Sequence, residues 1–530
     1  MKNNTKKLIS ALLACILVVS LFACGKPGTT TPTPPASDAP PVETTAAAPA
    51  KDTFYGAVSL DSGTLDPVGI TGAGGFLAMM YSYMEPLLDT KANGERVWVL
   101  ATGIDTIDDI HSVIHVREGV TFSNGNPLTA ADVLFTLKMY LDVPSQMMAV
   151  MYIDFEKTTI IDDYTIDLWY TSAITVNEDG KLSTVMIVDS ESYDPQAMSA
   201  NPIGTGPYIV TDYVVNSHTS LTAREDYWGA KPAIKNLYFK VINETSQVTN
   251  ALEIGEIDYG GVPTTDVEYI ESLGKFNIAQ SNAGYATAAY YNMSSTGLLA
   301  TKEARYAIDF AIDREAIVEL CFNGYASVVD WPCSEAMLDF EERFAGLHET
   351  YALGFNLDQA KEYAEKAGLV GKTIRIMTNG ASSYTTMAEI IQEDLGKIGV
   401  TAVINNYDQA TYYAMMSDPS NYEVALYATA APNVRADGVL NNTFFFFPLG
   451  WEGPEKDTFM ALSTIPLAGA LKDPKVRSDE LFEVVKAFEE ISPFFGICDT
   501  PTLSAIAKTV NVPAFYLDGS PRYQEMSFAS

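Results

Sequence analysis

A regular alternation of strand and helix patterns between residues 356 and 408 constrains the fold of this chain more than any other feature. Asn356 begins a capped helix, a β-rich run follows at 372–378, an amphipathic helix covers 387–399, and the run at 401–408 is again β-rich. Strands that are separated by single helices pair in parallel, because a crossover of that length returns the chain to the same end of the sheet. The second half of the chain therefore predicts an α/β layer with a parallel sheet.

The other elements predicted from the sequence mix hairpins and capped helices. Alternation over 111–125 ends at the turn pair Asn124-Gly125, and Thr129 with Asp132 forms a capping box that starts a helix. The segments 159–170 and 208–229 each predict a strand, a turn and a strand, and 234–242 is a further strand. A single long helix is expected from an N-cap at Thr301 to a terminating glycine at Gly324.

The length and charge of the chain limit its class. Its 530 residues suffice for two or three domains with real cores. The formal net charge of −34 repels nucleic-acid phosphates, so we expect no DNA or RNA partner. The acidity either keeps the protein soluble or attracts cationic ligands, and the sequence leaves both open.

The N-terminal residues predict export. Lys2, Lys6 and Lys7 precede an apolar stretch that ends at Phe22, which is typical of a signal peptide over residues 1–23. The sequence LFAC at 21–24 resembles a lipobox, and this resemblance implies that Cys24 carries the lipid; an ordinary secretory signal is the alternative. The Thr/Pro/Ala-rich residues 24–52 predict an extended tether.

Motifs of catalysis and metal binding are missing from the sequence. There is no phosphate-binding P-loop and no G-x-S-x-G elbow, and GITGAGGF at 69–76 fails the dinucleotide pattern at its third glycine. His111 and His115 share a face of one predicted strand but lie too far apart for a common metal. Cys321, Cys333 and Cys498 have no zinc spacing, and a disulfide between Cys321 and Cys333 stays open. We expect no enzyme, no cofactor and no metal site.

The stretch NPIGTGPYIV at 201–210 places two glycines beside a strand, as phosphate loops do. It lacks the lysine and the following helix that such a loop needs. Gly204 and Gly206 are therefore interpreted as residues that allow a tight bend of the backbone, and Pro207 as the residue that fixes the direction of the chain after the bend.

These residues carry a resemblance to a known family. NPIGTGPYIV, REDYWGAKPAIKNLYFKVI and ALEIGEIDYG occur in order, together with GTLDP, YSYMEPLL, VIHVREGVTFSNGNPLTAADVLFTL, KEARYAIDFAIDREAIV and FNLDQAKEYAEKAGL. The chain resembles the bacterial extracellular solute-binding proteins of the peptide/nickel type, which serve ABC importers. The resemblance spans residues 53–513.

The resemblance implies an α/β fold of two lobes, the periplasmic-binding-protein-like fold of type II (large cluster), with an extra α+β domain inserted in lobe I. Lobe I would comprise residues 53–88, 202–283 and 500–530. The inserted domain would be 89–201, and lobe II would be 284–499. Ligand would bind in the cleft between the lobes, which close by hinge motion.

The implied function is a monomeric, membrane-tethered substrate-binding protein that captures peptides, above all oligopeptides, and delivers them to ABC permease subunits. Its place would be extracytoplasmic, lipid-anchored at the outer face of the cytoplasmic membrane. The alternatives are a sugar oligomer, a metal chelate or another small polar solute in the same fold, and a tethered sensory receptor without transport.

The ligand-binding residues are expected in three places. The loop after Leu65-Asp66-Pro67 supplies backbone groups in peptide-binding relatives, which implies Thr71, Gly72, Ala73 and Gly74. Relatives also place an amine-binding aspartate near position 431, where this chain has alanine. Either Asp437 replaces that aspartate or the amine is not recognised. Three further candidates belong to the same stretch as Asp437, namely Tyr427, Asn433 and Arg435. Tyr285 and Trp451 are candidate aromatic walls of the site.

Overall fold

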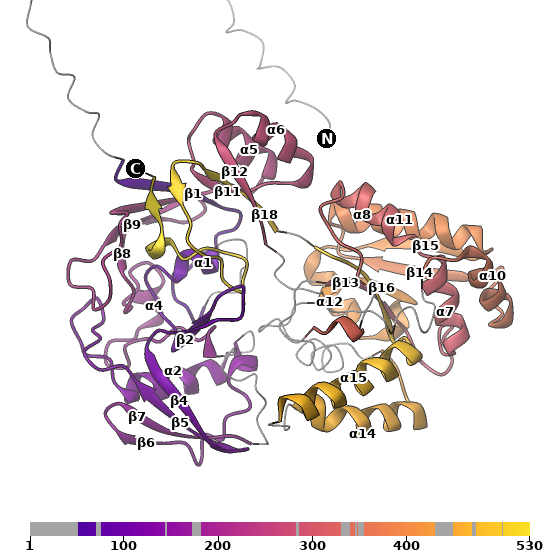
Figure 1. The fold of residues 1–530 in the computed structure, drawn as a ribbon, viewed down its shortest axis with the longest axis horizontal. Coiled ribbons are helices and arrows are strands. Elements are labelled where there is room, and N and C mark those ends of the chain that lie inside the picture. Colours follow the sequence, from indigo (N-terminus) through magenta and orange to yellow (C-terminus); the bar gives the residue numbers. More distant parts are fainter. Residues whose placement is uncertain are drawn as a thin grey trace, which may run out of the picture. The chain divides into compact units, whose positions relative to one another are not determined.

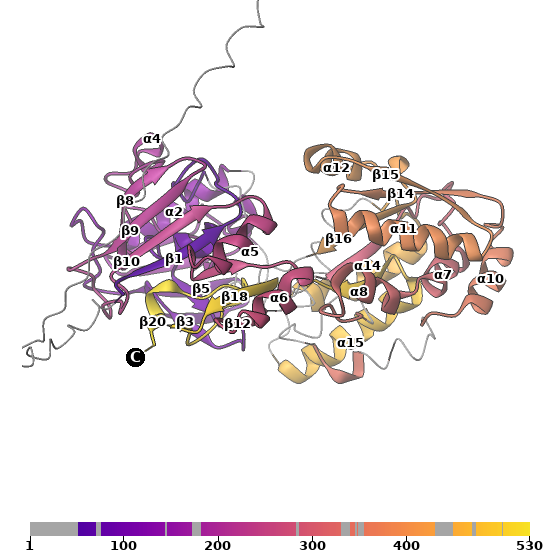
Figure 2. The same ribbon diagram turned by 90° about the horizontal axis from the view of Figure 1, so that it is seen from above.

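The computed structural model describes residues 51–69, 76–143, 146–171, 182–281, 286–329, 340–344, 347, 354–429, 449–468, 473–500 and 502–529. Three sheets of four or more strands and two two-stranded pairs organise these residues (Figures 1 and 2). Within them, no helix combines the length and the apolar character that crossing a membrane requires.

The seven-stranded sheet gathers strands from distant parts of the chain. Its spatial order is β12 (Phe276–Ser281), β18 (Thr502–Ala507), β11 (Tyr259–Gly261), β1 (Thr53–Val58), β10 (Asn236–Val241), β9 (His218–Ala223) and β8 (Tyr208–Val214). Strand β1 runs parallel to β10 and β11, and the β8–β9 hairpin confirms the strand–turn–strand prediction. Helices α5 (Thr245–Glu253) and α6 (Val267–Ser272) lie beside β11 and β12 (Figure 1).

The four-stranded sheet is antiparallel and comes from the chain between β1 and β8. It runs β4 (Ala101–Asp108), β5 (His111–Val116), β7 (Thr165–Trp169) and β6 (Thr159–Asp162). Helix α2 (Ala130–Leu141) begins at the expected capping box of Thr129 and Asp132. Shorter elements of this half are α1 (Phe76–Met80), β2 (Leu88–Thr90), β3 (Arg96–Trp98) and α4 (Pro195–Met198).

The glycines of the GTGPY stretch allow two backbone segments to lie unusually close together. A Cβ atom at Gly206 would lie 2.6 Å from the carbonyl carbon of Tyr83, and one at Gly204 would collide with the Tyr83 carbonyl oxygen. The Gly206 amide donates to that oxygen at 3.2 Å, and the Tyr208 amide donates to the Ser82 carbonyl at 2.9 Å. The interpretation that these glycines serve the backbone conformation, and not a phosphate ligand, is confirmed.

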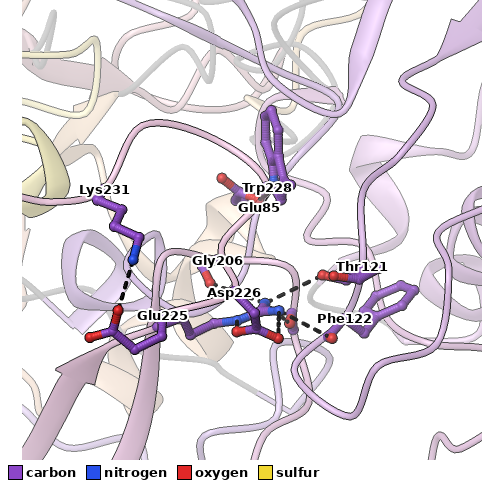
Figure 3. Close-up of polar contacts among 10 residues, drawn as sticks. Glu85, Thr121, Phe122, Gly206, Glu225, Asp226, Trp228 and Lys231 are labelled. Carbon is purple, nitrogen blue, oxygen red and sulfur yellow. Dashed lines mark hydrogen bonds and ion pairs between the residues drawn. The ribbon is translucent and has the colours of Figure 1, made fainter.

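Arg224, from the REDYWG motif, joins this bend to the segment before α2. Its guanidinium, buried with 4% exposed, donates to the carbonyls of Thr121, Phe122, Gly204 and Gly206 at 3.2–3.4 Å (Figure 3). Hydrogen bonds to a charged donor are stronger than neutral ones. One side chain therefore holds the segment leading into α2 and the segment entering β8 at fixed positions.

Glu85 is a buried carboxyl group next to this bend. It accepts a hydrogen bond from the Tyr227 hydroxyl at 2.6 Å. It also accepts one from Trp228 Nε1 at 3.1 Å, and Figure 3 shows Glu85 beside Trp228. Burial raises its pKa to about 7, against the lowering effect of these donors. The folded protein therefore holds a proton on Glu85 at pH values where the unfolded chain does not.

We expect the free energy of unfolding to fall as pH rises from about 4.5 to 7, by roughly 3 kcal/mol from Glu85 alone. The contribution is complete below the unfolded pKa and is lost as pH rises through the folded pKa. Glu85→Gln keeps a neutral group there and should flatten the slope by that amount in urea unfolding across the range. An unchanged slope would show that folding does not raise the pKa of Glu85.

A second buried ionic group connects the C-terminal segment to β2. Arg522, with 2% exposed, donates from Nε to Asp89 Oδ2 at 2.7 Å and from Nη1 to Asp518 Oδ2 at 3.0 Å. Its guanidinium carbon lies 3.7 Å from the ring centre of Tyr81 and 4.3 Å from that of Tyr516. The two-stranded pair β19 (Val510–Asn511) and β20 (Ser527–Phe528) flanks this segment.

The five-stranded sheet confirms the parallel prediction in part. Its order is β15 (Thr401–Asn406), β14 (Thr373–Thr378), β16 (Val424–Thr429), β13 (Ala286–Tyr291) and β17 (Phe494–Asp499). Strands β14, β15 and β16 are parallel, whereas β13 is antiparallel to both of its neighbours. Its helices are α7 (Lys302–Ala311), α8 (Arg314–Phe322), α10 (Leu357–Lys366), α11 (Ser382–Lys397), α12 (Gln409–Met416), α14 (Pro454–Ala468) and α15 (Pro474–Ile491).

The single helix expected from Thr301 to Gly324 is wrong. The chain forms α7 and α8 with a break at Ile312, whose ψ of 116° is extended. Asp313 caps the second helix by accepting from the Ala316 amide, and its own amide donates to Asp394 at 3.0 Å. The apolar periodicity continues through the break, so the pattern alone hides it.

In the described residues, the histidines pair with carboxylates and the cysteines are free thiols. His111, His115 and His218 each lie against a different carboxylate, those of Asp167, Asp105 and Asp212. Cys321 and Cys498 carry free thiols, and burial raises the pKa of Cys321 to about 11. Cys333 lies outside the described residues, so its pairing stays a prediction.

Candidate functional site

The carboxyl ends of β14, β15 and β16 lie at one edge of the five-stranded sheet, because these strands are parallel. Thr378 ends β14, and its hydroxyl donates to Asn406 Oδ1 at the end of β15 at 2.6 Å. The Gly380 amide donates to the same hydroxyl at 3.1 Å. Ligands of open α/β sheets bind outside this edge, so it is the candidate site.

Five tyrosines gather beside this edge, and we name them the tyrosine group: Tyr290, Tyr384, Tyr412, Tyr413 and Tyr427. The ring of Tyr427 is stacked with that of Tyr412 at 6.4 Å between centroids and meets Tyr413 edge-on at 6.1 Å. Tyr290 and Tyr412 are fully buried, Tyr427 is half-buried, and Tyr413 is 49% exposed. The group therefore exposes the rings of Tyr413 and, in part, Tyr427, and these rings pack against the buried rings of Tyr290 and Tyr412.

Tyr384 adds a hydroxyl donor near this surface. Burial raises its pKa to about 12, and it is hydrogen-bonded to the side chain of Thr287 and to the backbone of Ala428. Its hydroxyl therefore stays protonated at neutral pH. Thr287, which is 1% exposed, also shares a hydrogen bond of 3.1 Å with the hydroxyl of Thr500.

The hydrogen bond between Thr287 and Thr500 joins the two places where the chain passes between the seven-stranded and five-stranded sheets. One connection runs from β12 to β13 and the other from β17 to β18. Ser281 pairs with Thr502 on one side, and Ala286 pairs with Asp499 on the other. The strands on each side of the two connections are antiparallel neighbours, β12 with β18 and β13 with β17. Two adjacent crossings of the chain between two sheets are the arrangement of a hinge.

The structure describes two of the binding residues expected from the sequence. Tyr427 belongs to the tyrosine group. Trp451 is buried with 6% exposed in the core of the five-stranded sheet, where its ring lies 5.7 Å from that of Phe459. The ligand roles of both stay predictions. The others lie outside the described residues: Thr71, Gly72, Ala73, Gly74, Tyr285, Asn433, Arg435, Asp437 and the lipidation candidate Cys24.

Sequence reasoning missed Tyr384, Tyr412, Tyr413, Thr287 and Thr500. A signal existed for the first three, because Tyr384 and the Tyr412-Tyr413 pair lie in the first turns of the helices that follow two expected parallel strands. The threonines carry no local signal, since their contact joins residues far apart in the chain.

A shallow cavity of about 380 Å³ lies elsewhere, between α14 and α15, with Phe459, Leu462 and Ile491 among its lining residues. The lining contains no residue of the tyrosine group and none of the strand ends. The geometry of the parallel strands, rather than this cavity, defines the candidate site.

Comparison with known proteins gives the family. The family described as bacterial extracellular solute-binding proteins, family 5 Middle, matches residues 97–447. The nickel-binding protein NikA of Staphylococcus aureus is 23% identical over 354 residues, which are 65% of this chain and 68% of that protein. The oligopeptide-binding protein AppA of Bacillus subtilis is 24% identical over 370 residues, which are 64% of this chain and 66% of that protein.

A solved structure gives the same fold. The ABC transporter substrate-binding protein CtaP of Listeria monocytogenes superposes with a TM-score of 0.78 and 19% identity, covering 91% of this chain and 100% of that one. The two-lobed α/β fold expected from the sequence is confirmed. The match over residues 97–447 covers most of the chain, and the chain therefore belongs to the bacterial extracellular solute-binding proteins of family 5.

Proposed function

We propose that this chain is the substrate-binding component of an ABC importer and that it captures peptides, above all oligopeptides, in the cleft between its two lobes. Membership of a solute-binding family carries this proposal. The paired connections beside Thr287 and Thr500 support it, because closure of two lobes about a hinge needs such a joint.

The candidate site suits an extended polar chain with apolar side groups. Tyr413 and Tyr427 offer aromatic faces on which side chains of a ligand can pack. Tyr384 and Asn406 add a hydroxyl and an amide that can pair with peptide groups, and such bonds strengthen when closure excludes water. We expect Thr71, Gly72, Ala73 and Gly74 to contribute backbone groups to the same ligand.

Native mass spectrometry of the chain, purified without denaturation, tests the proposal. A set of bound masses that disappears on denaturation and is sequenced as peptides would support it. A single mass of a metal chelate or of a sugar oligomer would overturn the peptide assignment and leave the solute-binding function standing.

Asp437 gives a sharper test of peptide recognition. If its carboxylate pairs with the α-amino group, Asp437→Asn should weaken binding of a peptide with a free N-terminus at least roughly ten-fold, because a buried charge loses its partner. The N-acetylated form of the same peptide should bind both proteins alike in isothermal titration. An equal loss of affinity for both peptides would show that Asp437 does not bind the α-amino group.

The lipid anchor is the other part of the proposal. Cys24→Ser removes the thiol that would carry the lipid, so we expect the variant in the medium or the soluble extracytoplasmic fraction rather than with membranes. Metabolic labelling with a radioactive fatty acid should mark the wild type and not the variant. Cys15→Ser is the matched control and should keep both the label and the membrane location.

A further inference from the structure

The segment after α8 extends the five-stranded sheet beside β17. The Asp499 amide donates to the Ser327 carbonyl at 3.0 Å, and the Val329 amide donates to the Ile497 carbonyl at 3.3 Å. The Ser327 amide donates in turn to the Asp499 side chain at 2.7 Å. Ala326, 6% exposed, belongs to the core of this sheet. Residues 326–329 are therefore part of lobe II.

The residue just before this segment belongs to the other core. Tyr325 is half-buried against the hydrophobic cluster of the seven-stranded sheet and its helices, which contains Val248, Val267 and Leu503. Its carbonyl accepts a hydrogen bond of 3.1 Å from Nε2 of Gln280 on β12. Successive residues thus contribute to different lobes, Tyr325 to lobe I and Ala326 to lobe II.

A rigid turn sets this arrangement. Asn323 and Gly324 end α8 with φ angles of 49° and 75°, both in the left-handed region. Asparagine and glycine are the residues that adopt this region most readily. The turn directs the chain from the end of α8 toward the seven-stranded sheet and fixes where the Tyr325 ring lies.

We propose that Tyr325 is a positioning residue of the hinge, a noncovalent third link between the lobes that sets their opening equilibrium. The two covalent connections allow rotation, and rotation that separates the lobes at this point must withdraw the Tyr325 ring from its contacts. Even a half-buried aromatic side chain is a large apolar contact, so its loss shifts the populations of the lobe arrangements. Through that equilibrium Tyr325 would tune ligand affinity, a consequence that rests on the proposed solute-binding function.

The test measures the distance between the lobes in the full chain without ligand. Spin labels are placed through non-natural amino acids at the exposed positions Thr211 on β8 and Lys361 on α10, and pulsed electron resonance gives the distance distribution. We expect Tyr325→Ala to raise the population of arrangements that are minor in the wild type by roughly ten-fold. Tyr325→Phe keeps the ring and should restore the wild-type distribution.

Leu273→Ala is the matched control. Leu273 packs against the same cluster as Tyr325 but lies at the end of α6, within lobe I. Both alanine variants should lower the melting temperature, and only Tyr325→Ala should change the distances. If Tyr325→Ala fails to fold, Gln280→Ala, at an exposed position, should change the distribution in the same direction.

An unchanged distribution in Tyr325→Ala, or an equal change in Leu273→Ala, would overturn the proposal. Because the measurement uses no ligand, this outcome is independent of whether the protein binds peptides. A chain that bound no peptide but showed the distance change would contradict the proposed ligand alone.

Discussion

Arg522→Met is expected to lower the free energy of unfolding by about 3–5 kcal/mol, measured by urea denaturation at pH 7. Asp89 would keep its buried position and lose the guanidinium that pairs with it at 2.7 Å. Burial already raises the pKa of Asp89, and Arg522 is the main group that opposes this effect. The rings of Tyr81 and Tyr516 would lose their cation as well.

Two further variants separate the ionic effect from the loss of packing. Asp89→Asn combined with Arg522→Met removes the unpaired charge, so the double variant should recover part of the lost stability. Lys231→Met breaks an exposed ion pair with Glu225 and should leave the urea midpoint nearly unchanged. A small effect of Arg522→Met, no larger than that of Lys231→Met, would contradict the buried-pair argument.

Gly206→Ala is expected to cost about 3 kcal/mol or more, because the new methyl group would lie 2.6 Å from the Tyr83 carbonyl carbon and 2.7 Å from the Ser82 carbonyl oxygen. Both contacts are backbone atoms, so the two segments must separate. That separation would also strain the hydrogen bonds of Arg224 to the Gly204 and Gly206 carbonyls. Thermal and urea unfolding both measure the loss.

Gly396→Ala is the matched control, and we expect it to raise the free energy of unfolding rather than lower it. Gly396 lies near the end of α11, is exposed and has open space where a Cβ would stand. Alanine there should raise stability, by up to about 0.5–1 kcal/mol, because it favours the helical conformation. Similar effects of the two substitutions would mean that the close approach at Gly206 relaxes easily.

Local patterns predicted those parts of the fold that depend on neighbours in sequence. The capping box of Thr129 and Asp132, the Asn356 cap and the parallel strands of the five-stranded sheet are of this kind. The break at Ile312 was missed, because Asp313 caps a helix inside an unbroken apolar pattern and is held by Asp394 from another helix.

The candidate site was harder to predict for the same physical reason. The tyrosine group comes from β13, α11, α12 and β16, and its members meet only when the sheet has formed. Tyr427 was chosen as a candidate because of its place in a family motif. Thr287 and Thr500 meet across the two connections, and a pairing between such distant residues leaves no trace in composition or periodicity.

The position of β18 determines how much of the chain must be available before the seven-stranded sheet can close. This strand, residues Thr502–Ala507, fills a place between β12 and β11, inside the seven-stranded sheet and not at its edge. A chain still lacking it carries two unpaired strand edges where the finished sheet has none. The sheet that begins with β1 at Thr53 can therefore close only once the chain is available as far as Ala507.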